Sequence, residues 1–124
     1  MSVVLDTSVV VDALIDLGPR GAVARQVVEL GGAVPDVNIG ETFSAIRRNF
    51  LAGRLAESTF AAAVDLLAAM PVDVHATQEL RPRMAELSHS VSAFDSAPIA
   101  LAERLGAPPR HVGCEARGSP GPPV

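Results

Sequence analysis

The sequence contains no lysine, no tryptophan and no tyrosine, and each absence excludes a class of function. Walker-A phosphate binding, Schiff-base chemistry and a lysine general base all need a lysine side chain. Without tryptophan or tyrosine, stacking on nucleobases cannot be a major source of RNA affinity. A single cysteine, Cys114, excludes a disulfide framework and a cysteine-rich zinc site, and it indicates a reducing compartment. We therefore expect a cytoplasmic protein.

Charge and hydropathy place the chain among small ordered domains. The 124 residues are 48% hydrophobic and 19% charged, with a formal net charge of −4. This charge argues against a broad nonspecific polyanion-binding surface, but it allows a local arginine patch or an acidic site whose charge a divalent cation reverses. The apolar stretch 1–17 contains three aspartates and no basic start, so it predicts neither a signal peptide nor a membrane span.

Short apolar runs alternate with helical periodicity and predict a parallel α/β sheet. We expect strands over 2–5, 33–37 and 71–74, and helices over 9–17, 22–30, 38–51, 56–69, 78–87 and 93–105. Five of the ten prolines and three of the ten glycines lie in the last 17 residues, where the periodicity ends. The sequence therefore predicts one domain over 1–108 and an irregular tail over 109–124.

Three carboxylates, Asp6, Glu41 and Asp95, lie where a strand passes to a helix or where a helix begins. Taken singly, Asp6 could cap the first helix, Glu41 could face solvent, and Asp95 could form a capping box with Ser92. Taken together, acids at the carboxyl ends of parallel strands converge, and each close pair repels by roughly 1 kcal/mol in water. A divalent cation removes this repulsion, and oxygen-only ligands suit Mg²⁺ or Mn²⁺.

Three blocks of the sequence resemble a PIN-domain nuclease. The first strand and acid are VVLDTS at 3–8, the second acidic helix follows VPD at 34–36 and includes Glu41 and AIRR at 45–48, and the third block is FDSA at 94–97, ALAE at 100–103 and LGAP at 105–108. In length and in its sequence motifs the chain is most similar to VapC toxins of bacterial toxin–antitoxin pairs. The resemblance covers residues 1 to about 108.

This resemblance implies a PIN-like fold, with a short parallel sheet flanked by helices, and an endoribonuclease that uses Mg²⁺ or Mn²⁺. On this basis Asp6 and Asp95 bind the metal directly, Glu41 supports the metal or its water, and Thr7 or Ser8 orients Asp6. The metal would polarise a phosphate oxygen and supply hydroxide at neutral pH. The family also implies a homodimer and a VapB-type antitoxin whose tail reaches the acidic site.

Two neighbouring arginines, Arg47 and Arg48, are candidates for RNA binding, because arginine binds phosphate bidentately. Arg48 falls on the same helical face as Glu41, although an ordinary solvated face explains both arginines equally well. The remaining chemically reactive side chains are scattered and are not expected to be catalytic: His75, His89, His111 and Cys114.

The sequence departs from the family at two places. Pro98 stands where the family has a helix-compatible aromatic residue, and a proline inside a helix costs about 3 kcal/mol. After residue 108 the family has a strand with a fourth acid, Leu-x-Thr-x-Asp, whereas Glu115 lies outside that pattern. Read one nucleotide later, the codons from Pro109 onward permit Leu-Ala-Thr-Leu-Asp-Ala-Lys-Leu. We therefore predict a changed reading frame, no regular strand from residue 109, and a metal site short of one carboxylate.

The favoured function is a metal-dependent endoribonuclease toxin whose activity is reduced by the altered C-terminus. One alternative is a catalytically weak PIN-like binding module, which dimerises and captures its antitoxin. A haloacid-dehalogenase-type phosphatase is disfavoured, because it needs Asp-x-Asp at the first strand and Asp6 is followed by Thr7 and Ser8.

Overall fold

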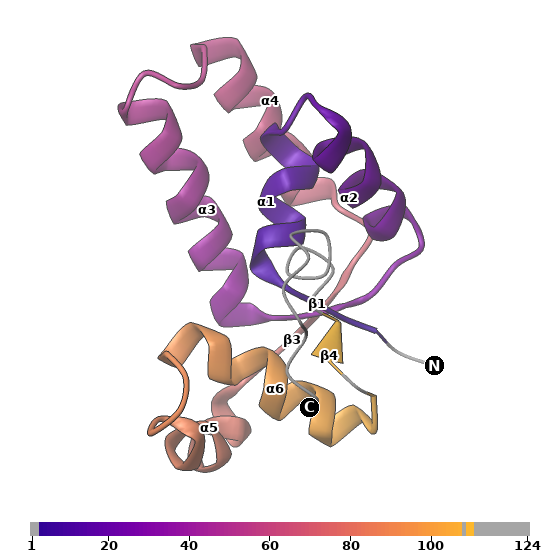
Figure 1. The fold of residues 1–124 in the computed structure, drawn as a ribbon, viewed down its shortest axis with the longest axis vertical. Coiled ribbons are helices and arrows are strands. Elements are labelled where there is room, and N and C mark those ends of the chain that lie inside the picture. The colour runs from indigo at the N-terminus through magenta and orange to yellow at the C-terminus, as the bar shows by residue number, and fades with distance from the viewer. Residues whose placement is uncertain (1–2, 108, 111–124) are drawn as a thin grey trace.

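Four short parallel strands form the sheet. The computed structural model describes residues 3–107 and 109–110, and the strands lie in the order β3-β2-β1-β4 (Figure 1). They are β1 (Val4–Leu5), β2 (Ala33–Pro35), β3 (Asp73–His75) and β4 (Pro109–Arg110). In register, Val4 lies opposite Ala33 on one side and Pro109 on the other. The central strands β1 and β2 are buried, and they are therefore apolar throughout.

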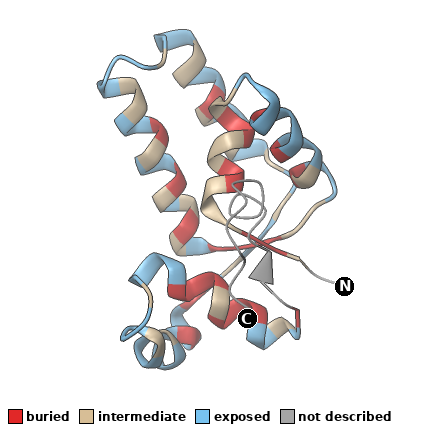
Figure 2. Ribbon diagram, in the orientation of Figure 1, coloured by how far each residue is buried: buried red, intermediate tan, exposed pale blue. Residues whose placement is uncertain are grey.

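Successive residues of the central strands serve two different apolar cores. Leu5 and Val34 belong to one core, and Val4 and Ala33 belong to the other. Side chains alternate between the faces of a strand, so a pair of apolar neighbours supplies both faces of the sheet. Helices cover both faces, and their buried residues lie on the sides that meet the sheet and one another (Figures 1 and 2).

The first helical layer starts with α1 (Thr7–Ile15), which follows β1 after a single residue, and α2 (Pro19–Glu29). α2 begins with a proline in its first turn, where the missing N–H breaks no helical hydrogen bond. Gly21 is buried in the first turn of α2, and a Cβ there would lie 1.8 Å from the carbonyl oxygen of Asp16, the residue after α1. The two helices therefore approach closely only because this residue is glycine.

The same layer continues with α3 (Asp36–Leu51) and α4 (Glu57–Ala69), a pair of helices that extends away from the sheet (Figure 1). Near the sheet, Ile46 and Ala63 are buried in the first core. Farther out, the ring of Phe60 stacks on Phe50 with a centroid distance of 4.4 Å, and it lies 6.5 Å from Phe43. The helical spacing of these apolar residues correctly predicts both helices.

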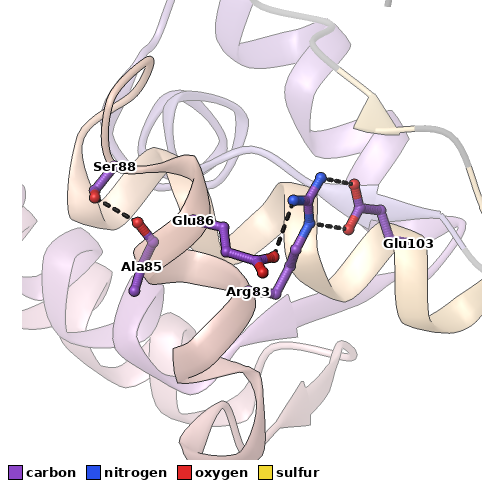
Figure 3. Close-up of polar contacts among 5 residues, drawn as sticks. All are labelled: Arg83, Ala85, Glu86, Ser88 and Glu103. Atoms are coloured by element: carbon purple, nitrogen blue, oxygen red, sulfur yellow. Dashed lines mark hydrogen bonds and ion pairs between the residues drawn. The ribbon is translucent and has the colours of Figure 1, made fainter.

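The opposite face is covered by η1 (Gln78–Leu80), α5 (Arg81–Leu87) and α6 (Ala93–Leu105) (Figure 1). Arg83 of α5 forms two hydrogen bonds with the carboxylate of Glu103 on α6, at 2.8 and 3.0 Å, and a third contact with Glu86 at 3.2 Å (Figure 3). The Arg83 guanidinium holds the pKa of Glu103 below its usual value. This ion pair links α5 to α6, the helix that carries Asp95.

The structure modifies two of the predictions made from the sequence, and it confirms the helix over 93–105. The helix predicted over 78–87 is divided into η1 and α5, with Pro82 in the first turn of α5. Pro98 lies inside α6 and is buried, so this helix does contain an interior proline. The prediction of no regular strand from residue 109 is wrong for Pro109–Arg110, which pair with β1 as β4. The remainder of the predicted tail, including Glu115 and Cys114, lies outside the described residues.

Candidate active site

Asp6 lies at the carboxyl end of β1, immediately before α1. It occupies the N-cap position with an extended backbone, φ −76° and ψ 146°, yet its side chain accepts no hydrogen bond from the backbone of the helix. Instead, Ser8 Oγ donates a hydrogen bond to Asp6 Oδ2 at 2.9 Å. The interpretation of Asp6 as a capping side chain is therefore wrong. Ser8, one of the two residues predicted to orient Asp6, holds this carboxylate in place.

Glu41 is turned toward α1 instead of facing open solvent. Its Oε1 accepts hydrogen bonds from Thr7 Oγ1 at 2.6 Å and from Asn38 Nδ2 at 2.9 Å, and the residue is half-buried. Thr7 thus orients Glu41, and of the two residues predicted as alternatives for orienting Asp6 it is Ser8 that does so. Because Thr7 directly follows Asp6, the hydrogen bond brings the first two acidic motifs to one end of the sheet. With two donors on Oε1, the second oxygen of Glu41 is the one available to a cation or a water molecule.

Asn38 is a site residue that sequence reasoning missed. It is 1% exposed, and its Nδ2 donates to Glu41 Oε1 and, at 3.1 Å, to the backbone carbonyl of Phe94. Its Oδ1 is buried and has no hydrogen-bond partner within the described residues. One amide group therefore joins the second acid to the first turn of α6, one residue before Asp95.

Pro98 explains why the Phe94 carbonyl is open to Asn38. In a regular α-helix this carbonyl accepts the N–H of the residue four positions later. That residue is Pro98, which has no N–H. The side chain of Asn38 replaces the missing donor. A signal for this pairing was thus present in the sequence, because an interior proline marks a carbonyl that needs a donor from elsewhere.

Asp95 is the third residue of α6, and its carboxylate is exposed. Ser92 Oγ accepts a hydrogen bond from the Asp95 backbone N–H at 3.1 Å, which is one of the two hydrogen bonds of the predicted capping box. This contact uses the backbone of Asp95 and leaves its carboxylate for another partner. The capping and the functional interpretations of Asp95 are therefore compatible.

A further acid, Asp36, follows β2 but has a structural partner. Thr77 is fully buried, and its Oγ1 donates to Asp36 Oδ1 at 2.6 Å. This hydrogen bond is the main cause that holds the pKa of Asp36 below its usual value. The pair ties the start of α3 to the segment after β3, which accounts for Asp36 without a catalytic role.

The acids at this end of the sheet offer carboxylate oxygens, the ligand chemistry that Mg²⁺ and Mn²⁺ prefer. Within residues 3–107 and 109–110, no three acidic, histidine or cysteine side chains lie close enough to hold one metal ion together. Asp6, Glu41 and Asp95 therefore do not form a closed three-carboxylate cage. They fit a cation held by one or two carboxylates and otherwise by water, which is a common arrangement for Mg²⁺. Direct binding by Asp6 and Asp95 stays a prediction.

A groove of about 410 Å³ runs along α3 beside Glu41. It is lined by Val37, Gly40, Glu41, Ser44, Arg48 and Phe94. The α3 members lie at positions i, i+3, i+4, i+7 and i+11 from Val37 and so share one face of the helix. Arg48 donates a hydrogen bond to Ser44 Oγ at 3.2 Å. The predicted common face of Glu41 and Arg48 is thus confirmed, whereas Arg47 is exposed and does not line the groove.

The order and spacing of these motifs agree with a known family. The sequence profile of the PIN domain matches residues 3–108. This chain belongs to the PIN domain family. Its PIN-like α/β fold, predicted from the sequence, is thereby confirmed. No curated protein sequence matches the chain.

A solved structure shares the fold of this PIN domain. The crystal structure of Mycobacterium tuberculosis VapC20, described as a sarcin-ricin loop cleaving toxin, superposes with a TM-score of 0.68. The match covers 94% of this chain and 95% of that chain at 19% sequence identity. It is a VapC toxin, the type that the sequence resembles. In the described part of the PIN domain, no helix is long and apolar enough to cross a membrane.

Proposed function

We propose that this PIN-domain chain is a metal-dependent endoribonuclease toxin of the VapC type, which hydrolyses phosphodiester bonds of RNA in the cytoplasm. The observation that supports it best is the hydrogen-bonded path Thr7–Glu41–Asn38–Phe94. This path joins the residue after Asp6, the second acid itself and the residue before Asp95. The structurally similar VapC20 is described as cleaving the sarcin-ricin loop, which supports a looped or single-stranded substrate.

In this proposal the three acids have separate roles. Asp6, oriented by Ser8, and Asp95, exposed at the start of α6, would hold Mg²⁺ or Mn²⁺. When bound, the ion would supply Lewis-acid polarisation of a phosphate oxygen and would make a bound water more acidic. Glu41, fixed through Oε1, presents its other oxygen to the attacking water and accepts its proton. The water oxygen would bond to phosphorus, the bond to the leaving oxygen would break, and a solvent water would protonate that oxygen.

Partners are proposed on the same basis. The chain would form a homodimer and would be inhibited by a VapB-type antitoxin whose tail reaches the acidic site. Several large apolar side chains are exposed, among them Leu17, Leu30 and Leu51, and burial against a protein partner would remove them from water. A gene for a small DNA-binding protein directly upstream would support this pairing.

The proposal is tested by incubating the purified full-length chain with single-stranded RNA in Mg²⁺, in Mn²⁺ and in excess chelator. We expect cleavage with either metal and none with chelator. Asp6→Asn and Asp95→Asn should lower the cleavage rate by about 100-fold or more while the melting temperature changes little, because each change removes a proposed metal ligand. Asp65→Asn is the matched control, because Asp65 is an exposed acid of α4 outside the site. Metal-independent cleavage, or equal activity in all three variants, contradicts the assignment.

The second candidate is a catalytically weak module that dimerises and captures its antitoxin. It is favoured by the lack of a three-carboxylate cluster within residues 3–107 and 109–110. A chain that binds the upstream-encoded protein but leaves RNA intact at all metal concentrations would establish this alternative.

The proposal that the altered C-terminus lowers the activity can be tested separately. We propose that the reading frame changes near Pro109, so that the fourth acid of the family is absent from this protein. Sequencing the gene should reveal Leu-x-Thr-x-Asp in the shifted frame. Restoring that frame should strengthen metal binding and cleavage, because it adds a carboxylate ligand. A shifted frame without this motif refutes the idea.

A further inference from the structure

Gly40 lies inside α3, where a glycine destabilises the helix relative to alanine. Its φ is not among the positive values found for glycines of the described chain, and a Cβ built on it would meet no atom within 4 Å. Neither the backbone conformation nor a close contact within the described chain therefore requires glycine. The missing side chain leaves open space in the groove that Glu41 also lines.

Phe94 bounds the same space from α6. It is 45% exposed, although a phenyl ring gains from burial, and it lines the groove opposite the α3 residues. Its backbone carbonyl is held by Asn38, which fixes the position of Phe94 relative to α3. Gly40 and Phe94 thus border an apolar recess beside the candidate catalytic acid.

The charges at the groove suit a nucleotide. Glu41 lies at the acidic site, and Arg48 lies seven residues later, about 10 Å farther along the helix axis. A guanidinium group binds phosphate well, and the apolar recess at Gly40 and Phe94, directly beside Glu41, suits the flat face of a base. A nucleotide lying along this face of α3 would have its base at the recess beside Glu41 and its phosphate toward the Arg48 guanidinium, which lies at Ser44.

We propose that this groove binds one nucleotide of the substrate RNA next to the bond that is cut, with its base between Gly40 and Phe94 and its phosphate at Arg48. The inference rests on the proposed ribonuclease function and adds to it a site that holds the flanking base. The sequence has no tryptophan or tyrosine, so this phenylalanine contact adds affinity at one nucleotide and is not an extended stacking surface.

The test compares two phenylalanines of similar exposure. Binding of a fluorescent, short single-stranded RNA of mixed sequence is measured by anisotropy in chelator, and the KM for its cleavage is measured in Mg²⁺. Phe94→Ala should weaken binding and raise KM about five- to tenfold, the loss of one stacked base. Phe43→Ala is the matched control, because Phe43 is 42% exposed, contacts Phe60 and does not line the groove. For an abasic ribose-phosphate oligomer, Phe94→Ala should change nothing.

Gly40→Leu distinguishes an effect on RNA binding in the groove from an effect on the stability of the fold. Leucine favours the helix over glycine, so the melting temperature should rise by about 2–6 °C. The same side chain fills the recess, so the affinity for RNA should fall. A damaged fold would lower both quantities together, whereas an occupied binding site moves them in opposite directions.

The inference is overturned if Phe94→Ala matches wild type, if it matches Phe43→Ala, or if its loss is equal for RNA and the abasic oligomer. It is also overturned if Gly40→Leu keeps the RNA affinity of wild type. A wild-type chain that cleaves RNA while the groove variants are unaffected refutes this inference alone. A wild-type chain that neither binds RNA in chelator nor cleaves it in Mg²⁺ refutes the proposed function as well.

Discussion

Asn38 donates to the Phe94 carbonyl, which Pro98 leaves without a helical donor. We therefore expect the effects of substituting Asn38 and Pro98 on the free energy of unfolding to be coupled, although the two residues are 60 positions apart in the sequence. Asn38→Leu removes the donor to the Phe94 carbonyl and one of the two donors to Glu41. A buried polar group left without a partner costs about 1–3 kcal/mol, and removal of the unpaired Oδ1 returns part of this. We expect Asn38→Leu to lower the free energy of unfolding by about 1–3 kcal/mol.

The same substitution should cost less when residue 98 is alanine. In Pro98→Ala the new backbone N–H can donate to the Phe94 carbonyl, so the helix no longer needs Asn38 for that bond. The cost of Asn38→Leu should therefore be about 1–2 kcal/mol smaller in the Pro98→Ala background than in wild type. This difference is the coupling energy of the pair.

Urea denaturation of wild type, both single variants and the double variant measures the coupling, provided that the m-values agree. Asn49→Leu is the matched control, because Asn49 is half-buried in the same helix and its amide donates to the Ala45 carbonyl, away from Pro98. Its cost should be the same with proline or alanine at position 98. Additive effects of Asn38→Leu and Pro98→Ala, within about 0.5 kcal/mol, would refute the argument that the amide replaces the missing N–H.

Three further predictions follow from single contacts. Thr7→Val removes one donor from Glu41 at nearly constant volume and should lower kcat about tenfold with little change in melting temperature; an equal kcat would exclude Thr7 as a positioning residue. Arg48→Ala should reduce the slope of log affinity for single-stranded RNA against log salt by about 0.7, whereas Arg47→Ala, outside the groove, should not; equal slopes would leave both on a solvated face. Glu103 has a lowered pKa, so its ion pair stabilises the fold above its usual value of 4.5 and this contribution is lost as pH falls through the lower folded value. In denaturation at a series of pH values, Glu103→Gln should be less stable than wild type by at most about 1 kcal/mol at pH 7, because the pair is exposed, and equal to it in acid; a constant difference contradicts the prediction.

Much of the fold follows from local patterns that the sequence determines by itself. The apolar spacing of Phe43, Ile46 and Phe50 predicts α3, and the consecutive apolar residues Val4 and Leu5 predict a strand covered on both faces. Such patterns are legible because each element must bury its own apolar side, whichever neighbour covers it. The acids at strand ends were found in the same way, since parallel strands bring their carboxyl ends together.

Only the tertiary structure decided which polar groups meet. Thr7 and Ser8 are neighbours with equivalent hydroxyls, but successive helical residues point about 100° apart, so the position of α3 assigns Thr7 to Glu41 and leaves Ser8 for Asp6. The partnership of Asn38 with the Phe94 carbonyl likewise depends on how α3 crosses α6. Periodicity describes one element at a time, whereas a hydrogen bond between elements requires their relative placement to within a few tenths of an ångström.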